Sequence, residues 1–287
     1  MVNKTALIVH SKHTKEYAKL VAKNYRDVEF LEVRRPPTNE VLKIKTDKDV
    51  IIGIGGGSVI DTAKVISKDK RVIAIPTTAS GSAMTPYATV WEKNKKISVP
   101  TKKPILKNYE FPIKLPDKVL QSTIFDALSH AIESLWSKNA TSESKKYSKK
   151  AIYLLNKNLK RKNKNIKEII TAGNYAGKAI AITKTNVIHA TSYPITIKYN
   201  IDHGTACGML LPYFVKYMDF KELPKLFGFD TTRELVEFLK QSFSPPKIKN
   251  LNIKLITNEA IKYKRIMDGP KEITKKDLEK ILSNLKK

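Results

Sequence analysis

The sequence predicts an α/β domain followed by an all-helical domain, and three observations support this. In the first third of the chain, short β-rich runs alternate with helical stretches, which is typical of a parallel sheet covered by helices. Residues 100–116 then contain four prolines and no sustained periodicity. Helical periodicity dominates the remainder. Because 287 residues also suit two domains, we place the domains at residues 1–110 and 111–287.

The individual elements follow from the same patterns. The predicted strands are residues 5–9, 28–33, 50–54 and 72–75, with helices between them at residues 15–23 and 58–67. The predicted helices of the second domain are residues 124–136, 149–159, 166–184, 234–241 and 275–285. The last of these follows Thr274, which is suited to an N-cap. The first domain therefore has a Rossmann-like pattern, which is typical of nucleotide-binding proteins.

The net charge of +27 is large for a chain of this length. Lysines are spread through nearly every segment, so we interpret the charge as a solvated surface. Neither zinc-finger spacing nor an aromatic RNP-like segment accompanies it, and we expect no nucleic-acid partner. A non-catalytic basic binding protein, which would show salt-sensitive affinity for nucleic acid, stays open as an alternative.

Cysteine usage and hydropathy indicate a cellular location. Cys207 is the single cysteine, which excludes an internal disulfide and fits a reducing compartment. The apolar stretch at residues 6–9 is too short for a signal core, and no run approaches the roughly 20 apolar residues of a membrane span. We therefore expect a cytoplasmic protein without a membrane partner.

Two loops at strand ends predict a cofactor site. Gly55, Gly56, Gly57 and Ser58 lie between a buried strand and a helix, where glycines allow a pyrophosphate to approach the backbone and the helix start attracts its charge. This run is neither a P-loop nor a GxGxxG motif after the first strand, and a tight turn is the alternative. The next strand, however, ends in a second small, hydroxyl-rich loop at residues 76–82, and open α/β sheets bind ligands at such ends.

A second group of residues predicts a metal site. Asp126 and His130 lie four positions apart on one predicted helix face, with Glu133 on the same side. A solvated polar face would explain this pair, but two of only five histidines, His189 and His203, occur together in a second segment of uncommon composition. One carboxylate with three imidazoles suits Fe(II) or Zn(II), whereas magnesium and calcium favour oxygen ligands.

The order and spacing of these motifs resemble the iron-containing (group III) alcohol dehydrogenase family. The resemblance is clear over roughly residues 50–215. It is carried by the glycine run with Asp61 and Lys64, by Pro76-Thr77-Thr78, by Asp126 to Glu133, and by His189 to His203-Gly204.

This resemblance implies reversible reduction of a small aldehyde to an alcohol with a nicotinamide cofactor, in a protein expected to form a homodimer. The implied metal ligands are Asp126, His130, His189 and His203. Together with the loop argument, the implied cofactor contacts are Gly55, Gly56, Gly57, Ser58, Asp61, Thr77, Thr78 and Ser82. A dehydroquinate synthase-like lyase on the same fold is the alternative enzyme, although the spacing of Asp126 and His130 fits the dehydrogenases better.

One branch of the family, the phosphonoacetaldehyde reductases, is more similar to this chain at residues 85–91, 133–140 and 192–194, which implies an anionic substrate. The chain also departs from the family. It is short, the loop after Thr78 lacks one residue, and Ala83 stands where an acidic residue is usual. Tyr193 stands where many members carry another histidine, and we predict that it relays a proton, with aromatic packing as the alternative.

The end of the first predicted strand bears on the choice of cofactor. NAD-preferring relatives often carry an aspartate near the position of Ser11, and here there is none. Lys12, His13, Arg34 and Arg35 offer positive charge for a 2′-phosphate, so we predict NADP(H) over NAD(H). The alternative is that these are ordinary surface residues.

Overall fold

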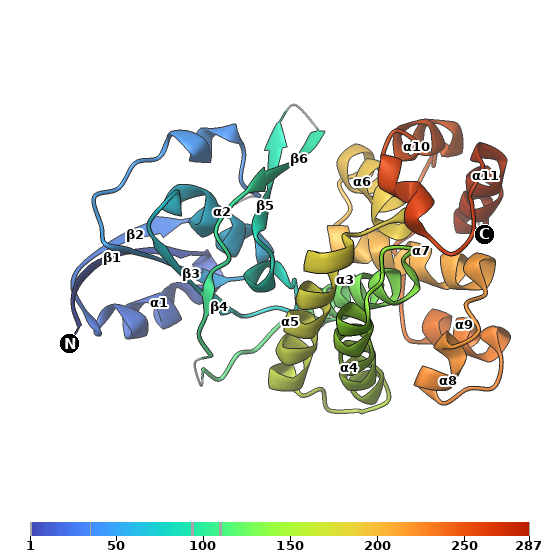
Figure 1. Ribbon diagram of the computed structural model, residues 1–287, viewed down its shortest axis with the longest axis horizontal. Helices are drawn as coiled ribbons and strands as arrows, with labels where there is room; N and C mark the ends of the chain where they lie inside the picture. The colour runs from blue at the N-terminus through green and yellow to red at the C-terminus, as the bar shows by residue number, and fades with distance from the viewer. Residues whose placement is uncertain (1, 35, 93–94, 109–110, 287) are drawn as a thin grey trace. The chain divides into compact units, whose positions relative to one another are not determined.

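The computed structural model describes residues 2–34, 36–92, 95–108 and 111–286. The chain divides into two compact units, Met1–Lys114 and Leu115–Lys287 (Figure 1). The first is an α/β unit with a parallel sheet, and the described part of the second consists of helices without a strand. The fold class predicted from the sequence is therefore confirmed.

The first unit is built on a five-stranded parallel sheet with the strand order β2-β1-β3-β4-β7. Because the strands are parallel, the carboxyl ends of β1, β3 and β4 lie side by side at one edge. The order reverses between β1 and β3, and sheets of this kind bind ligands at such a switch point. The strands are β1 (Val2–His10), β2 (Tyr25–Glu32), β3 (Val50–Gly55), β4 (Arg71–Pro76) and β7 (Ile105–Leu106).

Helices α1 (Lys15–Ala22) and α2 (Gly57–Ser67) cover opposite faces of this sheet (Figure 1). Alternate residues of a strand point to opposite faces. Accordingly, Ile8 of β1 packs in a cluster with Val21 of α1, while its neighbour Leu7 packs in the cluster that includes α2. Burial on both faces explains why the central strands are continuous apolar runs that the sequence identifies readily.

Smaller elements complete the first unit. Strands β5 (Tyr87–Glu92) and β6 (Lys95–Pro100) form a separate antiparallel ribbon, which is not predicted from the sequence. Short 3-10 helices complete it: η1 (Lys12–Thr14), η2 (Asn39–Lys43) and η3 (Ser82–Met84).

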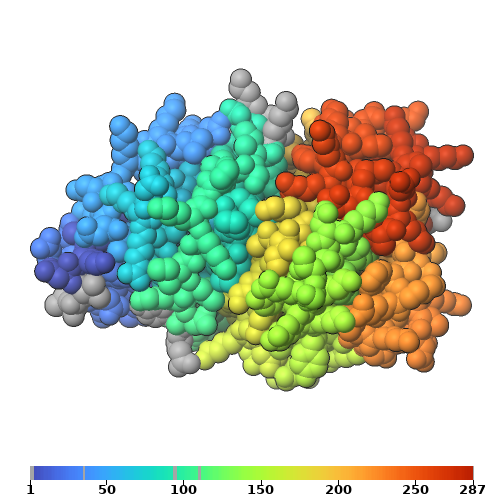
Figure 2. All heavy atoms as spheres, viewed as in Figure 1, coloured from blue at the N-terminus to red at the C-terminus, as the bar shows by residue number. Residues whose placement is uncertain are grey.

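The second unit is organised around α3 (Asp117–Trp136), which packs against α4, α5 and α7. Nearly every residue of α3 from Ser122 onward is buried. Beyond α7, the segments up to the last helix form a continuous part of the surface of this unit (Figure 2). The remaining helices are α4 (Ser142–Leu159), α5 (Ile166–Thr183), α6 (Val187–Tyr199), α7 (His203–Met218), α8 (Leu223–Phe227), α9 (Thr232–Gln241), α10 (Ile253–Ala260) and α11 (Lys275–Ser283), with 3-10 helices η4 (Lys264–Asp268) and η5 (Asn284–Lys286).

Helices α3, α4, α5, α9 and α11 correspond to helices predicted from the sequence. The helix expected at residues 275–285 is α11, and Thr274 caps it by accepting a hydrogen bond from the Asp277 N–H at 3.2 Å. Helices α6, α7, α8 and α10 were not predicted. Helices α6 and α7 are largely buried, so no polar face reveals their period, and each contains an internal proline, Pro194 or Pro212. In the described residues, no helix has the length and apolar character needed to cross a membrane.

Candidate metal centre

Helix α3 contributes the first part of the candidate site. Asp126 and His130 project from the same face, with His130 Nε2 3.9 Å from Asp126 Oδ1. One turn later, Glu133 is fully buried. The polar face proposed from the sequence therefore does not face solvent, and three titratable side chains lie inside the helical unit.

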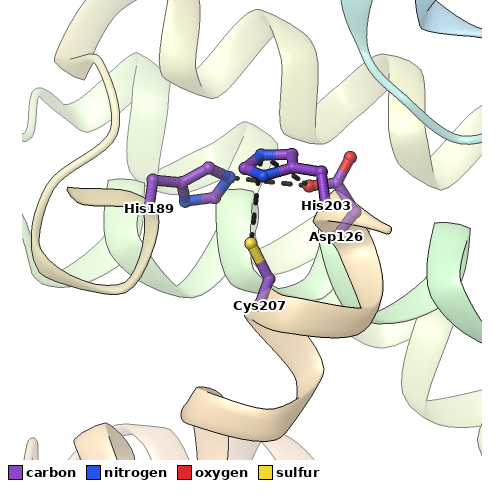
Figure 3. A group of neighbouring side chains, drawn as sticks. All are labelled: Asp126, His189, His203 and Cys207. Atoms are coloured by element: carbon purple, nitrogen blue, oxygen red, sulfur yellow. Dashed lines mark hydrogen bonds and ion pairs between the residues drawn. The ribbon is translucent and has the colours of Figure 1, made fainter. Parts of the chain in front are cut away.

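Helices α6 and α7 bring further donors to Asp126 (Figure 3). The Oδ1 atom of Asp126 lies 3.6 Å from His189 Nε2 and 3.7 Å from His203 Nε2. The Sγ atom of Cys207 lies 4.0 Å from His203 Nε2. Ligand atoms of all four side chains lie within 4.8 Å of one another. The structure thus gathers Asp126, His189 and His203, adds Cys207, and places His130 beside this group.

Two atoms of the group indicate that a ligand belongs between them. Asp126 Oδ1 and His189 Nε2 are buried, and neither makes a hydrogen bond with any residue that the structure describes. Buried polar atoms are nearly always satisfied, and a bound ion is one recognised reason for an exception. A carboxylate oxygen and imidazole nitrogens that converge without hydrogen bonds to each other fit a divalent iron or zinc ion.

Glu133 fixes the orientation of His189. Its Oε2 atom is 2.6 Å from His189 Nδ1, on the ring edge opposite Nε2. In the neutral tautomer whose Nδ1–H donates to this carboxylate, Nε2 carries the free lone pair, and this atom lies 3.6 Å from Asp126 Oδ1. A carboxylate that holds a histidine in this way is typical of metal sites, where it sets the tautomer and raises the basicity of the ligand.

The same carboxylate also anchors the start of α6. Glu133 accepts backbone N–H groups from Asn186 at 3.1 Å, from Ile188, and from His189 at 3.2 Å. These donors have no partner within the helix, because the first N–H groups of a helix point beyond its end. The Asn186 side chain accepts the Trp136 indole N–H at 3.1 Å. The carboxyl-terminal turn of α3 therefore determines where α6 begins.

A close approach of α7 to α3 positions His203. A Cβ atom at Gly204 would collide with the backbone carbonyl oxygen of Ser122, so only glycine allows this contact. The preceding residue Asp202 caps α7 by accepting the Thr205 N–H at 3.2 Å, and it also accepts the Ser122 hydroxyl. His203 is the first residue of α7, and its side chain is 29% exposed.

Tyr193, the predicted proton relay, lies in the aromatic surroundings of the group. Its ring stacks on that of His203 with centroids 5.5 Å apart, and it meets the edge of His189 at 6.4 Å. Tyr263 packs on its other side at 5.1 Å. The structure thus places Tyr193 next to two of the predicted ligands.

The electrostatics of the group depend on its burial. Burial alone would raise the pKa of Asp126, but the adjacent His130, His189 and His203 hold it below its usual value. Burial would lower the pKa of His189, whereas Cys207, Glu133 and Asp126 raise it well above its usual value. Burial raises the pKa of the Cys207 thiol. The burial of these groups and their mutual electrostatic interactions thus act on each pKa in opposite directions.

The predicted cofactor loops lie together in the first unit. Gly55 ends β3, Gly56 is the N-cap of α2, and Gly57 and Ser58 begin that helix. Strand β4 is the parallel neighbour of β3, and the Thr77 N–H donates to the Gly55 carbonyl at 3.0 Å. A Cβ atom at Gly56 would lie 3.2 Å from Thr78 Oγ1. The two loops therefore line the same carboxyl edge of the sheet.

Two of the predicted cofactor residues make internal contacts. The Asp61 carboxylate accepts the Ser82 hydroxyl and the Thr89 N–H, the latter at 3.0 Å. It also pairs with the ammonium of Lys64, whose side chain is fully buried, at 3.2 Å. These bonds tie α2 to the loop after β4 and to β5, so Asp61 and Ser82 support the shape of the second loop.

The contributions of Cys207 and Glu133 to the site are not evident from the sequence. The single cysteine indicates only a reducing compartment, although Cys207 follows His203 by four positions, the same spacing as between Asp126 and His130. Glu133 was noted for its helix face, but its partners lie more than 50 residues away in the chain. No local pattern predicts such a contact.

Comparison with known families agrees with this architecture. A family model described as the iron-containing alcohol dehydrogenase matches residues 2–112, and a model of the carboxyl-terminal part of the same family matches residues 121–285. The fold and site define a protein with one unit built on a parallel sheet and one helical unit in which Asp126, His189, His203 and Cys207 are clustered. The chain belongs to the iron-containing alcohol dehydrogenase family.

Individual relatives span a range of activities. The phosphonoacetaldehyde reductase of Streptomyces viridochromogenes is 30% identical over 59% of this chain and 53% of its own length. The 4-hydroxybutyrate dehydrogenase of Clostridium kluyveri is 32% identical over 58% of this chain and 55% of its own length. The chain thus spans about half the length of these curated relatives. A crystal structure of an iron-containing alcohol dehydrogenase is 25% identical, with a TM-score of 0.84, over 99% of this chain and 92% of that chain.

We predict that Glu133→Gln weakens metal binding by about 10- to 100-fold, because the neutral amide cannot hold the His189 ring and the start of α6 as the carboxylate does. Competition with a chromogenic chelator measures the affinity. Glu237→Gln, on the exposed side of α9, is the matched control and should bind metal as the unmodified chain does. A folded Glu133→Gln variant with unchanged affinity would remove Glu133 from the site.

Proposed function

We propose that this chain catalyses the metal-dependent, reversible reduction of an aldehyde to an alcohol with a nicotinamide cofactor. The observation that carries the proposal is the convergence of the Asp126, His189 and His203 side chains. Two of their atoms, Asp126 Oδ1 and His189 Nε2, are buried and make no hydrogen bond with a described residue. Membership of the family and the paired loops at the carboxyl edge of the sheet support it further.

In this proposal, Asp126, His189 and His203 hold the ion, and His130 is the further ligand predicted from the sequence. A divalent ion held there would supply Lewis-acid polarisation of an aldehyde carbonyl, and a reduced nicotinamide cofactor would supply the hydride. The carboxylate of Asp126 contributes negative charge, and Glu133 keeps His189 Nε2 directed at the ion. The partial exposure of His203 leaves the site accessible from that side.

The proposed substrate is a small aldehyde that carries a negatively charged group. Two relatives, a phosphonoacetaldehyde reductase and a 4-hydroxybutyrate dehydrogenase, bear names that refer to substrates with an acidic group. The excess of basic side chains would also attract an anion toward the protein.

We predict that His203→Ala lowers metal occupancy and carbonyl reduction together, because the ion loses one of its ligands. Metal analysis by mass spectrometry and a nicotinamide absorbance assay measure the two effects. His13→Ala, an exposed histidine of the first unit, is the control and should retain its metal. Full metal content and full activity in His203→Ala would end the ligand assignment.

We predict that Tyr193→Phe lowers kcat by about 100-fold while metal content stays unchanged, because the ring packing on His203 persists and the hydroxyl is lost. Steady-state kinetics with the aldehyde of highest activity provide the measurement. Unchanged kcat would assign Tyr193 to aromatic packing alone.

Cofactor preference follows from side chains near the switch point of the sheet. We propose NADP(H) over NAD(H), because Ser11 directly follows β1 while Lys12 and His13 are exposed. Arg34 is 86% exposed and pairs with Glu32 at the end of β2, at 3.0 Å. Arg35, the fourth basic residue of the prediction, lies outside the described residues.

We therefore expect higher kcat/KM with NADPH than with NADH, and a shift toward NADH in Ser11→Asp, whose carboxylate repels a 2′-phosphate. Glu32→Gln makes the opposite change to Ser11→Asp, because it removes a carboxylate at the end of β2. This variant should raise kcat/KM with NADPH. Equal or better efficiency with NADH in the unmodified chain would overturn the proposed preference.

A further inference from the structure

Lys64 is a fully buried lysine on α2, in the unit that carries the predicted cofactor loops. It is not among the predicted cofactor contacts. Lysine is almost never fully buried unless its charge is paired, and burying an ammonium is costly unless acceptors surround it. The groups around Lys64 therefore indicate what this residue does.

The ammonium of Lys64 holds the loop after β4, residues 77–86, and the start of β5. It lies 3.0 Å from the Ser82 carbonyl oxygen and 3.1 Å from Thr85 Oγ1, and it also donates to the Tyr87 carbonyl oxygen. One turn earlier on α2, the Asp61 carboxylate accepts the Ser82 hydroxyl of the same loop. Two opposite charges on α2 thus bind both acceptors and a donor of one short segment.

These contacts favour the charged form of Lys64. An ammonium offers three N–H donors and no acceptor, and the atoms that it faces are oxygens. Burial lowers the pKa of Lys64, whereas the Asp61 carboxylate, 3.2 Å away, opposes this shift. A neutral side chain at position 64 would leave the Asp61 carboxylate without its counter-charge and two carbonyl oxygens without this donor.

The same loop brings a polar atom to the start of α2. The Oγ atom of Ser80 is buried and makes no hydrogen bond with any residue that the structure describes. It lies beside the first turn of α2, since a Cβ atom at Gly57 would be 3.3 Å from it. Buried hydroxyls are nearly always hydrogen-bonded, and the free N–H groups of a helix start favour an anion. Both features indicate that a phosphate group binds there.

We propose that Lys64 is a positioning residue for cofactor binding, and that its ammonium fixes the loop after β4 so that Ser80 contacts a cofactor phosphate. The inference rests on the nicotinamide cofactor of the proposed function. Lys64 acts through the loop and does not itself contact the cofactor. Between Ser80 and the anchored Ser82 lies Gly81, whose φ of 72° is in the left-handed region. Glycine restrains the backbone least, so the loop depends on an anchor outside itself.

Fluorescence titration of the full chain with NADPH and with NADH tests the inference. Lys64→Met should raise the Kd of the preferred cofactor by about tenfold or more, because the loop loses a charged hydrogen-bond donor. Lys102→Met, an exposed lysine that pairs with Asp69 at 3.6 Å, is the matched control and should bind the cofactor as the unmodified chain does. Unchanged Kd in Lys64→Met, folded by circular dichroism, would overturn this inference alone. An unmodified chain that binds neither cofactor would contradict the proposed function as well.

A double-mutant cycle separates positioning from a purely structural role. Ser80→Ala should raise the Kd by about tenfold in the unmodified chain, but only slightly in the Lys64→Met chain, where the hydroxyl is already misplaced. Additive effects, or no effect of Ser80→Ala alone, would overturn the proposal, since a lysine that only stabilises the fold leaves the contribution of Ser80 intact.

Thr85→Val keeps the cycle decisive if Lys64→Met does not fold. It removes one acceptor of the ammonium and retains both charges of the Lys64–Asp61 pair. We expect the Kd to rise by about threefold and the effect of Ser80→Ala to shrink in this background. An unchanged Kd in Thr85→Val, with the full effect of Ser80→Ala retained, would contradict the positioning role.

Discussion

The helical unit depends on one buried carboxylate. Glu133 accepts three backbone N–H groups at the start of α6 and faces Nδ1 of His189 at 2.6 Å. Each of these donors would be costly to bury without an acceptor. A single side chain on α3 therefore secures the start of another helix and sets which nitrogen of His189 faces Asp126. The Glu133 carboxylate therefore contributes both to the geometry of the site and to the packing of the helical unit.

The anchoring of α6 by Glu133 is one of the features by which three helices form one site. Asp126 belongs to the buried central helix α3, so it cannot shift without disturbing its neighbours. His189 is held through Glu133, and His203 comes close because Gly204 lets α7 contact Ser122 directly. The donors are thus arranged before any ligand binds, which lowers the cost of binding the ion.

The first unit was largely predictable from the sequence. Strands β3 and β4 are buried on both faces, so each reads as an apolar run, and the loops that follow contain the small residues needed there. The ribbon of β5 and β6 was missed. The cofactor contacts predicted for the loops after β3 and β4 remain predictions. The hydrogen bond from the Ser82 hydroxyl to Asp61 stabilises the loop after β4.

The second unit was predicted less completely, for a physical reason. Asp126 and His130 were found because both lie on one helix and follow its period. Helices α6 and α7 lack that signal, since they are mostly buried. Their histidines were identified by rarity and by family resemblance. The pairing of Glu133 with His189 and the place of Cys207 depend on contacts between distant segments, which only the fold reveals.

The central claim is that Asp126, His189 and His203 converge on one metal ion. Anomalous diffraction from crystals of the chain grown with zinc, recorded on both sides of the zinc edge, tests it most directly. We predict a strong anomalous peak enclosed by Asp126 Oδ1, His189 Nε2 and His203 Nε2. Zinc-soaked crystals with these three side chains ordered, and with no peak between them, would contradict it.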